Sequence, residues 1–431
     1  MSADACIARD RFRDMDVLRR GGLRKVLLLF DGTNEEIRIV GGAVRNTMLG
    51  LPVTEVDLAT TALPREVMER AAVAGLKPVP TGIEHGTVTV IVDGEAFEVT
   101  TLRADVETDG RHAVVRFGRS FAQDALRRDF TINALYATAD GEVLDYVGGL
   151  ADLAARRVRF IGDPHARVRE DYLRILRFFR FHAAYGEGSP DAAGLEAVIS
   201  ERRGLAHLSR ERVRAELMKL LVTRRYAEVA MTMSEAGLLL PLLGGIALPE
   251  RLRRLAAIGA CDQNAPDALL NLAGLAVLVV EDAQRLRENL RLSNDEATRL
   301  AQAAQTLAGL HARSAPPDEA RLLELLFLNG RRALCDALRL AQAESRAEPD
   351  AADWHVARRL AAMAPVPRLP IGGAELLQQG IPAGPRVGQV LKAFQAAWIR
   401  AGFPREPERL NDLLESVMAH THPADRQDSP S

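Results

Sequence analysis

The stretch from 40 to 60, VGGAVRNTMLGLPVTEVDLAT, predicts a unit of strand, turn, helix and strand, and it limits the possible folds more than any other segment. Gly41 and Gly42 end an apolar run, and because glycine takes positive φ easily, a phosphate can approach the backbone there. A short helix over 43–49, with Arg45 near its start, offers free N–H groups to the same anion. We therefore expect a phosphate-binding turn at the end of a strand.

Two carboxylates, Glu55 and Asp57, lie at the end of this unit with Val56 between them. On a strand this spacing places both carboxylates on one face and Val56 in the core. Neighbouring carboxylates repel each other unless a cation lies between them, and Mg²⁺ prefers a few carboxylates completed by substrate phosphates and water. Either motif alone is more often an ordinary turn or an edge strand with solvated acids. Their coupling predicts metal-assisted nucleotidyl transfer, with Glu55 and Asp57 as catalytic metal ligands.

The chain changes character near residue 150. Before this point, runs rich in β-branched residues predict strands, and after it Leu/Ala/Arg-rich segments predict helices only. The Asp93-Gly94 pair predicts a hairpin turn. The expected fold class is therefore α+β. The predicted strands cover 26–30, 37–40, 55–59, 87–92, 96–101 and 143–146, and the helices predicted before residue 150 include 1–23 and 65–75.

Composition excludes several classes of protein. A hydrophobic content of 47% and a charged content of 26% are ordinary for a globular protein. Because the net charge is −2, any attraction to nucleic acid must be local, and Lys and Arg outnumber Asp and Glu between 156 and 225. The three cysteines lie far apart without zinc-ligand spacing, which fits a reducing cytosol. The charged start is not typical of a signal peptide and no stretch is apolar enough to span a membrane, so we expect a cytoplasmic protein.

Several polar residues in the β-rich part are further site candidates. Glu98 points outward on a predicted strand and is about equally expected to be a third catalytic carboxylate or a structural anchor. Arg127 and Arg128 offer triphosphate oxygens a bidentate grip. Asp129 is expected to orient one of these arginines or to cap a helix. Asn133 is expected to reach a ribose hydroxyl or to cap a helix.

The stretch 170–181, EDYLRILRFFRF, predicts a well-packed helix. Asp171 and Arg174 are three residues apart and therefore neighbours on one face, and Arg177 and Arg180 continue the step. An intrahelical salt bridge beside a solvated basic stripe is the simplest interpretation. The alternative is base recognition, because arginine donates and carboxylate accepts, as the Watson–Crick edges of cytosine and adenine require. Readout of this kind contributes about 1–3 kcal/mol of discrimination.

Taken in order, these motifs resemble those of the class II tRNA nucleotidyltransferases (CCA-adding enzymes) and the related bacterial poly(A) polymerases. The resemblance spans about 37 to 220 and is carried by VGGAVRNTMLG, EVDLAT, TGIEHGTVT, FEVTTLR, RHAVVRFG, RRDFTINAL, EDYLRILRFFRF and SRERVRAEL. It implies a polymerase-β-like head over 1–150, a helical neck over 151–245, and a helical body and tail over 246–431 with a disordered end. It also implies addition of C, C and A to the tRNA 3′ end from CTP and ATP with Mg²⁺.

The resemblance assigns roles to matching positions of this chain. Its tail motif matches 380–388, which is expected to open a helix running to about 400, and its basic neck is expected to contact the tRNA acceptor stem. The loop over 103–118 is implied to be the flexible element that helps to switch from C to A addition. The implied site residues are Gly42 and Arg45 for nucleotide, Glu55 and Asp57 for metal, Arg128 for triphosphate, Asp171 and Arg174 for the base, and Arg177 and Arg180 in support.

Two positions depart from the family pattern, which normally has Asp at Glu55 and at Asn46. Glutamate moves the carboxylate by roughly 1.5 Å, and Mg²⁺ tolerates misplaced ligands poorly. We therefore expect slower turnover or activity with Mn²⁺, and a looser orientation of Arg45 beside Asn46. Two alternative functions stay open: a poly(A)- or A-adding relative, and a tRNA-binding protein whose catalysis is weakened by these two residues.

Overall fold

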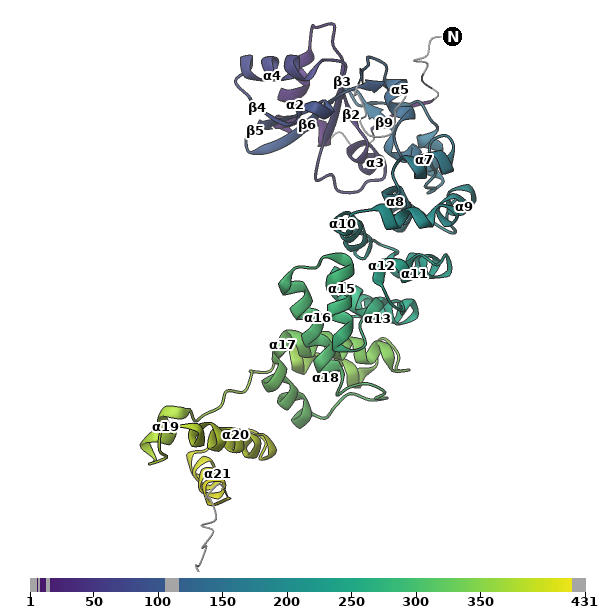
Figure 1. The fold of residues 1–431 in the computed structure, drawn as a ribbon. Coiled ribbons are helices and arrows are strands. Elements are labelled where there is room, and N and C mark those ends of the chain that lie inside the picture. The colour runs from purple at the N-terminus through teal and green to yellow at the C-terminus, as the bar shows by residue number, and fades with distance from the viewer. Residues whose placement is uncertain (1–5, 7, 13–15, 105–115, 421–431) are drawn as a thin grey trace, which may run out of the picture. The chain divides into compact units, whose positions relative to one another are not determined.

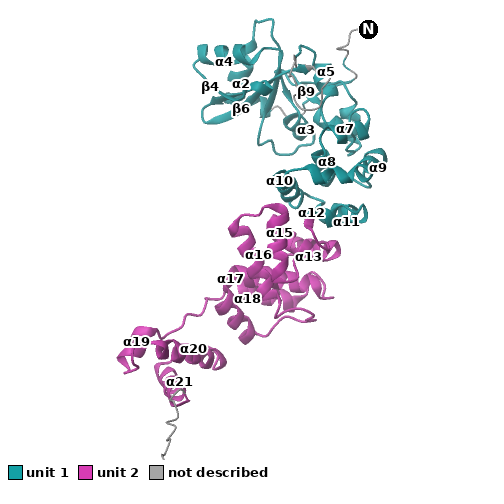
Figure 2. Cartoon of the chain, viewed as in Figure 1, with its two compact units in different colours: residues 1–242 teal, residues 243–431 magenta. Residues whose placement is uncertain are grey.

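Figure 1 shows the computed structural model of the chain, which describes residues 6, 8–12, 16–104 and 116–420. The chain divides into two compact units, residues 1–242 and residues 243–431 (Figure 2). The boundary expected at 150 therefore lies inside the first unit. The C-terminal end beyond residue 420 and most of the predicted flexible loop, at 105–115, lie outside the described residues.

The first unit begins with an eight-stranded sheet in the order β1-β10-β9-β2-β3-β6-β5-β4. Strands β3 and β6 are parallel, and every other neighbouring pair described in this sheet is antiparallel. A separate short pair, β7 and β8, flanks the undescribed loop. The strands are β1 Ala8–Arg11, β2 Ile37–Val40, β3 Asp57–Thr60, β4 Lys77–Gly82, β5 Thr87–Val92, β6 Glu95–Thr101, β7 Arg103–Ala104, β8 Arg116–Phe117, β9 Leu135–Ala137 and β10 Glu142–Asp145.

Local sequence explains several of these elements. The strands predicted at 37–40 and 87–92 are confirmed as β2 and β5. The predicted hairpin is also confirmed, because Asp93 and Gly94 take φ values of 52° and 86° between the antiparallel β5 and β6. Helix α4 (Pro64–Val73) overlaps the helix predicted over 65–75, and the Leu63 N–H before it donates to Oε2 of Glu66, which is the glutamate half of a capping box.

Two predictions near the N-terminus are wrong. Residues 1–23 do not form one helix, since β1 is followed by α1 (Asp16–Arg19) and Gly21 begins α2 (Gly21–Leu27) instead of ending a helix. Residues 26–30 are the end of α2 and the 3₁₀ turn η1 (Leu28–Phe30), not a strand. The buried residues Leu23, Val26, Leu27 and Phe30 recur with a helical period that the strand interpretation ignored.

Helices account for the rest of the first unit, as expected from the change near 150. An aromatic cluster joins them to the sheet-bearing part: Phe160 contacts Phe130 at a ring distance of 4.8 Å and stacks on Phe178 at 5.4 Å, and Phe130 also contacts Phe181. This shared core explains why both parts form one unit. The helices are α3 Gly42–Met48, α5 Phe121–Leu126, α6 Gly149–Ala154, α7 Pro164–Glu170, α8 Leu173–Tyr185, α9 Ala192–Ser200, α10 Arg210–Leu220 and α11 Tyr226–Glu235, and α12 Leu239–Leu243 ends at the unit boundary.

The described part of the second unit is helical. Its last three helices share a core in which Trp398 packs edge-on against Phe403, and Phe327 of α17 packs against the same core. The helix predicted to run to about 400 is confirmed as α20. None of the described helices is long and apolar enough to cross a membrane. The helices are α13 Pro249–Cys261, α14 Ala268–Ala276, α15 Val280–Leu290, α16 Asn294–Leu307, α17 Glu319–Glu344, α18 Ala352–Met363, α19 Gly373–Gln378, α20 Pro385–Arg400 and α21 Pro407–His420.

Candidate active site

The glycine turn lies between β2 and α3. Gly41 takes a φ of 69°, a conformation that favours glycine, and its N–H donates to the Leu135 carbonyl of β9 (3.0 Å). A Cβ built on Gly41 lies 3.5 Å from the Asn133 carbonyl oxygen and 3.8 Å from Nη1 of Arg128. The turn therefore brings the start of α3 next to an arginine of the RRD motif, as a phosphate site requires.

The paired carboxylates lie at the start of β3. Asp57 is the first residue of the strand, Glu55 lies two residues before it, and Val56 between them is buried whereas both acidic residues are exposed. The predicted alternation of burial is found, but the strand predicted from residue 55 begins only at Asp57, so Glu55 lies just before it. Glu98 is the Cα partner of Asp57 on the parallel strand β6, so both project from the same face of the sheet.

The electrostatics of Asp57 reflect this crowding of negative charge. Desolvation raises the pKa of Asp57, repulsion from Glu98 and from Glu55 raises it further, and Arg128 opposes the change. Within the ranges that the structure describes, no group of three or more His, Cys, Asp or Glu residues could hold a metal ion by itself. The carboxylates of Asp57 and Glu98, which project from the same face of the sheet, still fit Mg²⁺, because this ion completes its coordination with substrate phosphates and water.

The two adjacent arginines are oriented by a residue that sequence reasoning missed. Nε of Arg127 donates to Oδ1 of Asp124 (2.7 Å), and Nε and Nη2 of Arg128 donate to Oδ2 (3.1 and 3.0 Å). Asp129 orients neither of them, so that alternative is wrong. The available signal was the spacing of Asp124 from both arginines, three and four residues along α5 and its end.

Asp129, which is held by Asn133, links the sheet-bearing part to α8. The Asp129 carboxylate accepts from Nε of Arg177 (2.8 Å) and from Nδ2 of Asn133 (3.1 Å). Although burial opposes ionisation of Asp129, the Arg177 guanidinium holds its pKa below the usual value. Arg180 pairs with the buried Glu216 of α10 (2.6 Å). The expected solvated basic stripe is therefore wrong for Arg177 and Arg180, because Arg177 pairs with Asp129 between α5 and η3 (Thr131–Asn133) and Arg180 pairs with Glu216 of α10.

Arg45 is buried between α3 and the end of α8. Its guanidinium donates to the side-chain oxygens of Asn133 and Asn46 and to the Tyr185 hydroxyl (2.7 Å), and it lies 3.9 Å from the centre of the Tyr185 ring. Burial lowers the pKa of Arg45. The looser orientation expected from Asn46 is not found, because its amide oxygen accepts from Nε and Nη2 of Arg45 while its Nδ2 donates to Pro52.

The helix predicted over 170–181 is interrupted. Helix α7 ends at Glu170 and α8 begins at Leu173, and Asp171 between them is extended, with a φ of −154°. Its short carboxylate explains the break, because Oδ1 accepts from the Leu173 N–H (3.1 Å) and Oδ2 from Nη2 of Arg212 (2.7 Å).

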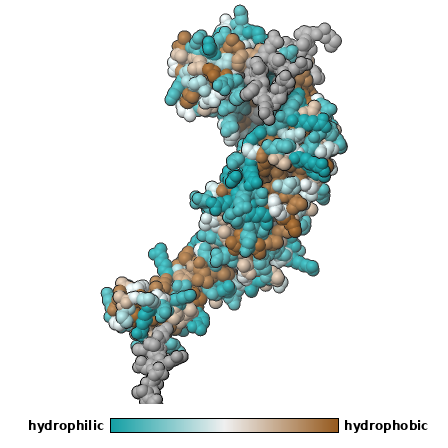
Figure 3. All heavy atoms as spheres, in the orientation of Figure 1, coloured by the Kyte–Doolittle hydropathy of each residue, from teal (hydrophilic) through white to brown (hydrophobic). Residues whose placement is uncertain are grey.

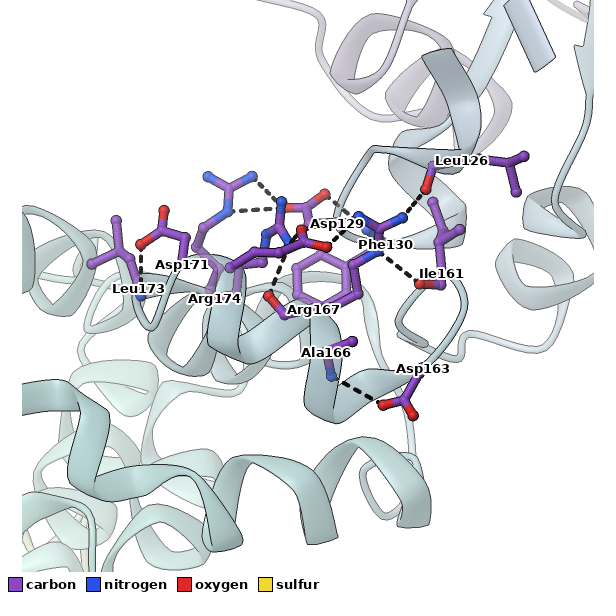
Figure 4. A network of polar contacts seen from close by, with 12 residues as sticks. Leu126, Asp129, Phe130, Ile161, Asp163, Ala166, Arg167, Asp171, Leu173 and Arg174 are labelled. Carbon is purple, nitrogen blue, oxygen red and sulfur yellow. Dashed lines mark hydrogen bonds and ion pairs between the residues drawn. The ribbon is translucent and has the colours of Figure 1, made fainter. Parts of the chain in front are cut away.

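Figure 4 shows the network around this break. The Arg174 guanidinium pairs with Glu170 and donates to the Arg167 carbonyl (2.8 Å), so the expected salt bridge between Asp171 and Arg174 is not formed. Arg167 in turn donates to Glu170 (3.0 Å) and to the carbonyl of Leu126, the last residue of α5. The network therefore joins the predicted base-reading arginine to the helix that carries Asp124.

Comparison with known proteins agrees with these motifs. The Poly A polymerase head domain family matches residues 37–159, and the family described as the probable RNA and SrmB-binding site of polymerase A matches residues 192–248. The mitochondrial CCA tRNA nucleotidyltransferase 1 of Mus musculus is 33% identical over 420 residues, which cover 92% of this chain and 90% of that protein. The CCA-adding enzyme of Geobacillus thermodenitrificans is 35% identical over 382 residues, covering 87% and 91%.

Solved structures agree in fold. The crystal structure of the Bacillus stearothermophilus CCA-adding enzyme in complex with CTP has a TM-score of 0.71 and 28% identity to this chain, covering 93% of this chain and 99% of that one. Nucleotidyltransferases of this kind generally use a divalent metal ion. By its near full-length similarity to these relatives, the chain belongs to the family of CCA-adding tRNA nucleotidyltransferases.

Proposed function

We propose that this chain adds C, C and A to the 3′ end of tRNA from CTP and ATP, without a nucleic-acid template. The observation that carries the proposal is the meeting of Asp57, Glu98 and Arg128 beside the Gly41 turn. It puts carboxylates for a cation and a guanidinium for phosphates around one backbone turn, as nucleotidyl transfer requires. Identities of 33% and 35% over nearly the full length of two CCA-adding relatives favour tRNA and these two nucleotides as substrates.

In this proposal Glu55 and Asp57 hold Mg²⁺, with Glu98 as a neighbouring acid. When bound, the ion neutralises the charge of the carboxylates and of the triphosphate and favours ionisation of the attacking hydroxyl. The crowding that raises the pKa of Asp57 is the reason a cation is favoured at this place. Arg127 and Arg128 bind the triphosphate against the backbone of Gly41 and Gly42.

The proposed readers of the base are Asp171 and Arg174, supported by Arg177 and Arg180. An arginine donor and a carboxylate acceptor together match cytosine and adenine and mismatch uracil and guanine. Asp171 and Arg174 are each held by another residue, Arg212 and Glu170 respectively, in the structure. Glu170 and the Arg167 carbonyl both engage Nη1 of Arg174, so its other guanidinium nitrogens can donate to a base, and Asp171 can use a remaining lone pair.

The proposed tRNA surface is the helical part of the first unit. Basic residues outnumber acidic ones between 156 and 225, and hydrophilic residues cover much of this part on the face shown in Figure 3. Binding through phosphates predicts an affinity that falls steeply with salt. The proposed compartment is the cytoplasm, although three of the similar relatives are mitochondrial proteins.

Incorporation of single nucleotides tests this function against its alternatives. The substrates are tRNA ending before C74, after the first C and after the second C, each incubated with Mg²⁺ and labelled CTP, ATP, UTP or GTP. Addition of two C and one A, with no U or G, supports the proposal. Addition of A alone, or of a long A tail, supports an A-adding or poly(A) enzyme. Binding of tRNA without incorporation supports the weakened tRNA-binding protein.

Asn46 and Glu55 differ in how strongly they support the alternative of a tRNA-binding protein with weakened catalysis. Asn46 keeps its hydrogen bonds to Arg45, so the loss of charge there leaves the site's packing in place. Glu55 remains the more consequential departure, because it is itself one of the two proposed metal ligands. A rate that is low with Mg²⁺ and higher with Mn²⁺ is the expected outcome for the wild-type chain.

A further inference from the structure

One buried carboxylate serves both arginines of the proposed triphosphate site. Asp124 is 1% exposed, and it accepts from Arg127 through Oδ1 and from Arg128 through Oδ2. The hydroxyl of Tyr136, on β9, also donates to Oδ2 (2.7 Å) and accepts from Nε of Arg128 (3.1 Å). Although burial opposes ionisation of Asp124, the Arg128 and Arg127 guanidiniums hold its pKa below the usual value. The carboxylate is therefore charged and saturated with donors.

These contacts leave one end of Arg128 for a ligand. Nε and Nη2 are used by Asp124, whereas Nη1 has no hydrogen-bond partner among the described residues and lies beside the Gly41 turn. Because the guanidinium is planar, fixing Nε and Nη2 also fixes the direction of Nη1. The same guanidinium acts on the charge of Asp57. Nη1 therefore points into the region where acids and phosphates are proposed to meet.

Charge balance gives Asp124 a second effect. Two adjacent guanidiniums repel each other, and one carboxylate between them leaves a single net positive charge. That remaining charge is the one available to a triphosphate. Without Asp124, Arg127 would lose its carboxylate partner, and Arg128 would keep only the Tyr136 hydroxyl through Nε, so neither arginine would be held as firmly.

We propose that Asp124 is a positioning residue for nucleoside triphosphate: it fixes Arg128 so that Nη1 faces the Gly41 turn and restrains Arg127 beside it. The inference deepens the proposed function and depends on it. Asp124 does not touch the nucleotide and acts through the arginines. Tyr136 supports the same arrangement by bridging Asp124 and Arg128.

The chain supplies a matched control for a merely structural role. Asp152 is also fully buried, accepts from two arginines, Arg157 (2.8 Å) and Arg159 (2.9 Å), and accepts from one hydroxyl, that of Thr131 (2.6 Å). Its arginines are 49% and 43% exposed and have no part in the proposed site, whereas those of Asp124 are each 22% exposed. Both aspartates therefore have the same kind of buried network, but only one is joined to the turn.

The test compares Asp124→Asn and Asp152→Asn in the full chain. We measure KM and kcat for CTP and ATP with tRNA ending before C74, the dissociation constants of CTP and ATP alone, and the melting temperature. Loss of a charged hydrogen-bond partner predicts that Asp124→Asn raises both KM and the dissociation constants by about tenfold or more. Asp152→Asn should lower the melting temperature and change nucleotide affinity by less than about twofold. Equal losses of affinity in both variants, or none in either, overturn the inference.

If Asp124→Asn does not fold, a milder variant tests the positioning role of Asp124. Tyr136→Phe keeps the ring and removes only the bridging hydroxyl, so nucleotide affinity should fall in the same direction by roughly threefold. Unchanged affinity in this variant, with Asp124→Asn unfolded, overturns the inference. A wild-type chain that binds CTP but transfers nothing would overturn the proposed function alone, because the dissociation constants still report on Asp124.

Discussion

Arg299 in the second unit and Arg128 in the first unit both donate hydrogen bonds to aspartates. They differ in how many of their guanidinium nitrogens these bonds engage. Every guanidinium nitrogen of Arg299 donates to a carboxylate, of Asp267 or Asp336, and the three residues tie α14, α16 and α17 together. Arg128 donates through Nε and Nη2 and presents Nη1 to the Gly41 turn.

Another arginine extends this contrast. Arg251 in the second unit donates to the carbonyls of Gly274, Ala273 and Val277 at the end of α14 and to Glu344 of α17. Such an arginine closes a helix end, and each of its three guanidinium nitrogens donates to a protein acceptor. The comparison teaches that a buried arginine marks a candidate site when one guanidinium nitrogen has no partner among the described residues and lies at a backbone turn. It marks a scaffold when all three nitrogens donate to protein acceptors.

The largest expected effect is on catalysis in the first unit. Asp57→Asn removes a proposed metal ligand and should lower nucleotide incorporation on the order of a thousandfold or more. It should not lower stability, because the folded chain raises the pKa of Asp57 and so disfavours its charge at neutral pH. Asp93→Asn, in an exposed hairpin turn, is the matched control and should keep wild-type activity. A destabilised but active Asp57→Asn chain would contradict both halves of this prediction.

The converse is expected in the second unit. Arg299→Gln leaves two carboxylates without their shared cation and should cost about 3–5 kcal/mol of local stability. Hydrogen exchange should accelerate in α14, α16 and α17, while the CTP dissociation constant stays unchanged. The control is Arg253→Ala, which breaks an exposed pair with Glu250 and should cost less than about 1 kcal/mol. Weaker CTP binding in Arg299→Gln would break the distinction between scaffold and site.

A smaller effect concerns the length of one carboxylate. Glu55→Asp should raise the rate with Mg²⁺ by roughly tenfold and reduce the advantage of Mn²⁺, because a shorter ligand suits the strict geometry of Mg²⁺. Stability should not change, since Glu55 is exposed and precedes β3. The test measures incorporation rates of the wild-type and Glu55→Asp chains with Mg²⁺ and with Mn²⁺. If the two chains have the same rate with each metal, the expectation is refuted.

The smallest expected effect is a pH dependence in the helical part of the first unit. Hydrogen bonds from His165 of α7 to Glu196 and Glu201 raise the pKa of His165, while Arg169 competes for Glu201 and Asp163 also faces the ring. A raised folded-state pKa contributes stability that is fully present below the unfolded value of about 6.5 and is lost as pH rises through the folded value.

Hydrogen exchange of α7 and α9 measures this contribution. His165→Gln should accelerate exchange at pH 6 more than at pH 8.5. The effect should be small, because the pair is open to solvent and screened by salt. An equal acceleration at both pH values would show that packing, not charge, holds the two helices together.

Local sequence patterns were sufficient to predict many elements of the fold. They failed where a segment fits both the strand period and the helix period. The strands β2 and β5 and the Asp93-Gly94 turn follow from alternation and turn chemistry. Residues 26–30 are apolar enough for either state, and the helical spacing of buried residues decided the outcome. Strand β9 was not predicted, because all three of its residues are buried and no alternation marks it.

The site shows the same division. By itself the sequence determined which residue types are present and their spacing along one element: the glycine turn, the alternation around Val56 and the helical character after 150. Tertiary structure alone decided the partners, since Asp129 meets Arg177 across 48 residues and Asp171 meets Arg212 across 41. Ion pairs between distant segments depend on the packing that brings them within hydrogen-bond distance, and no local period encodes that packing.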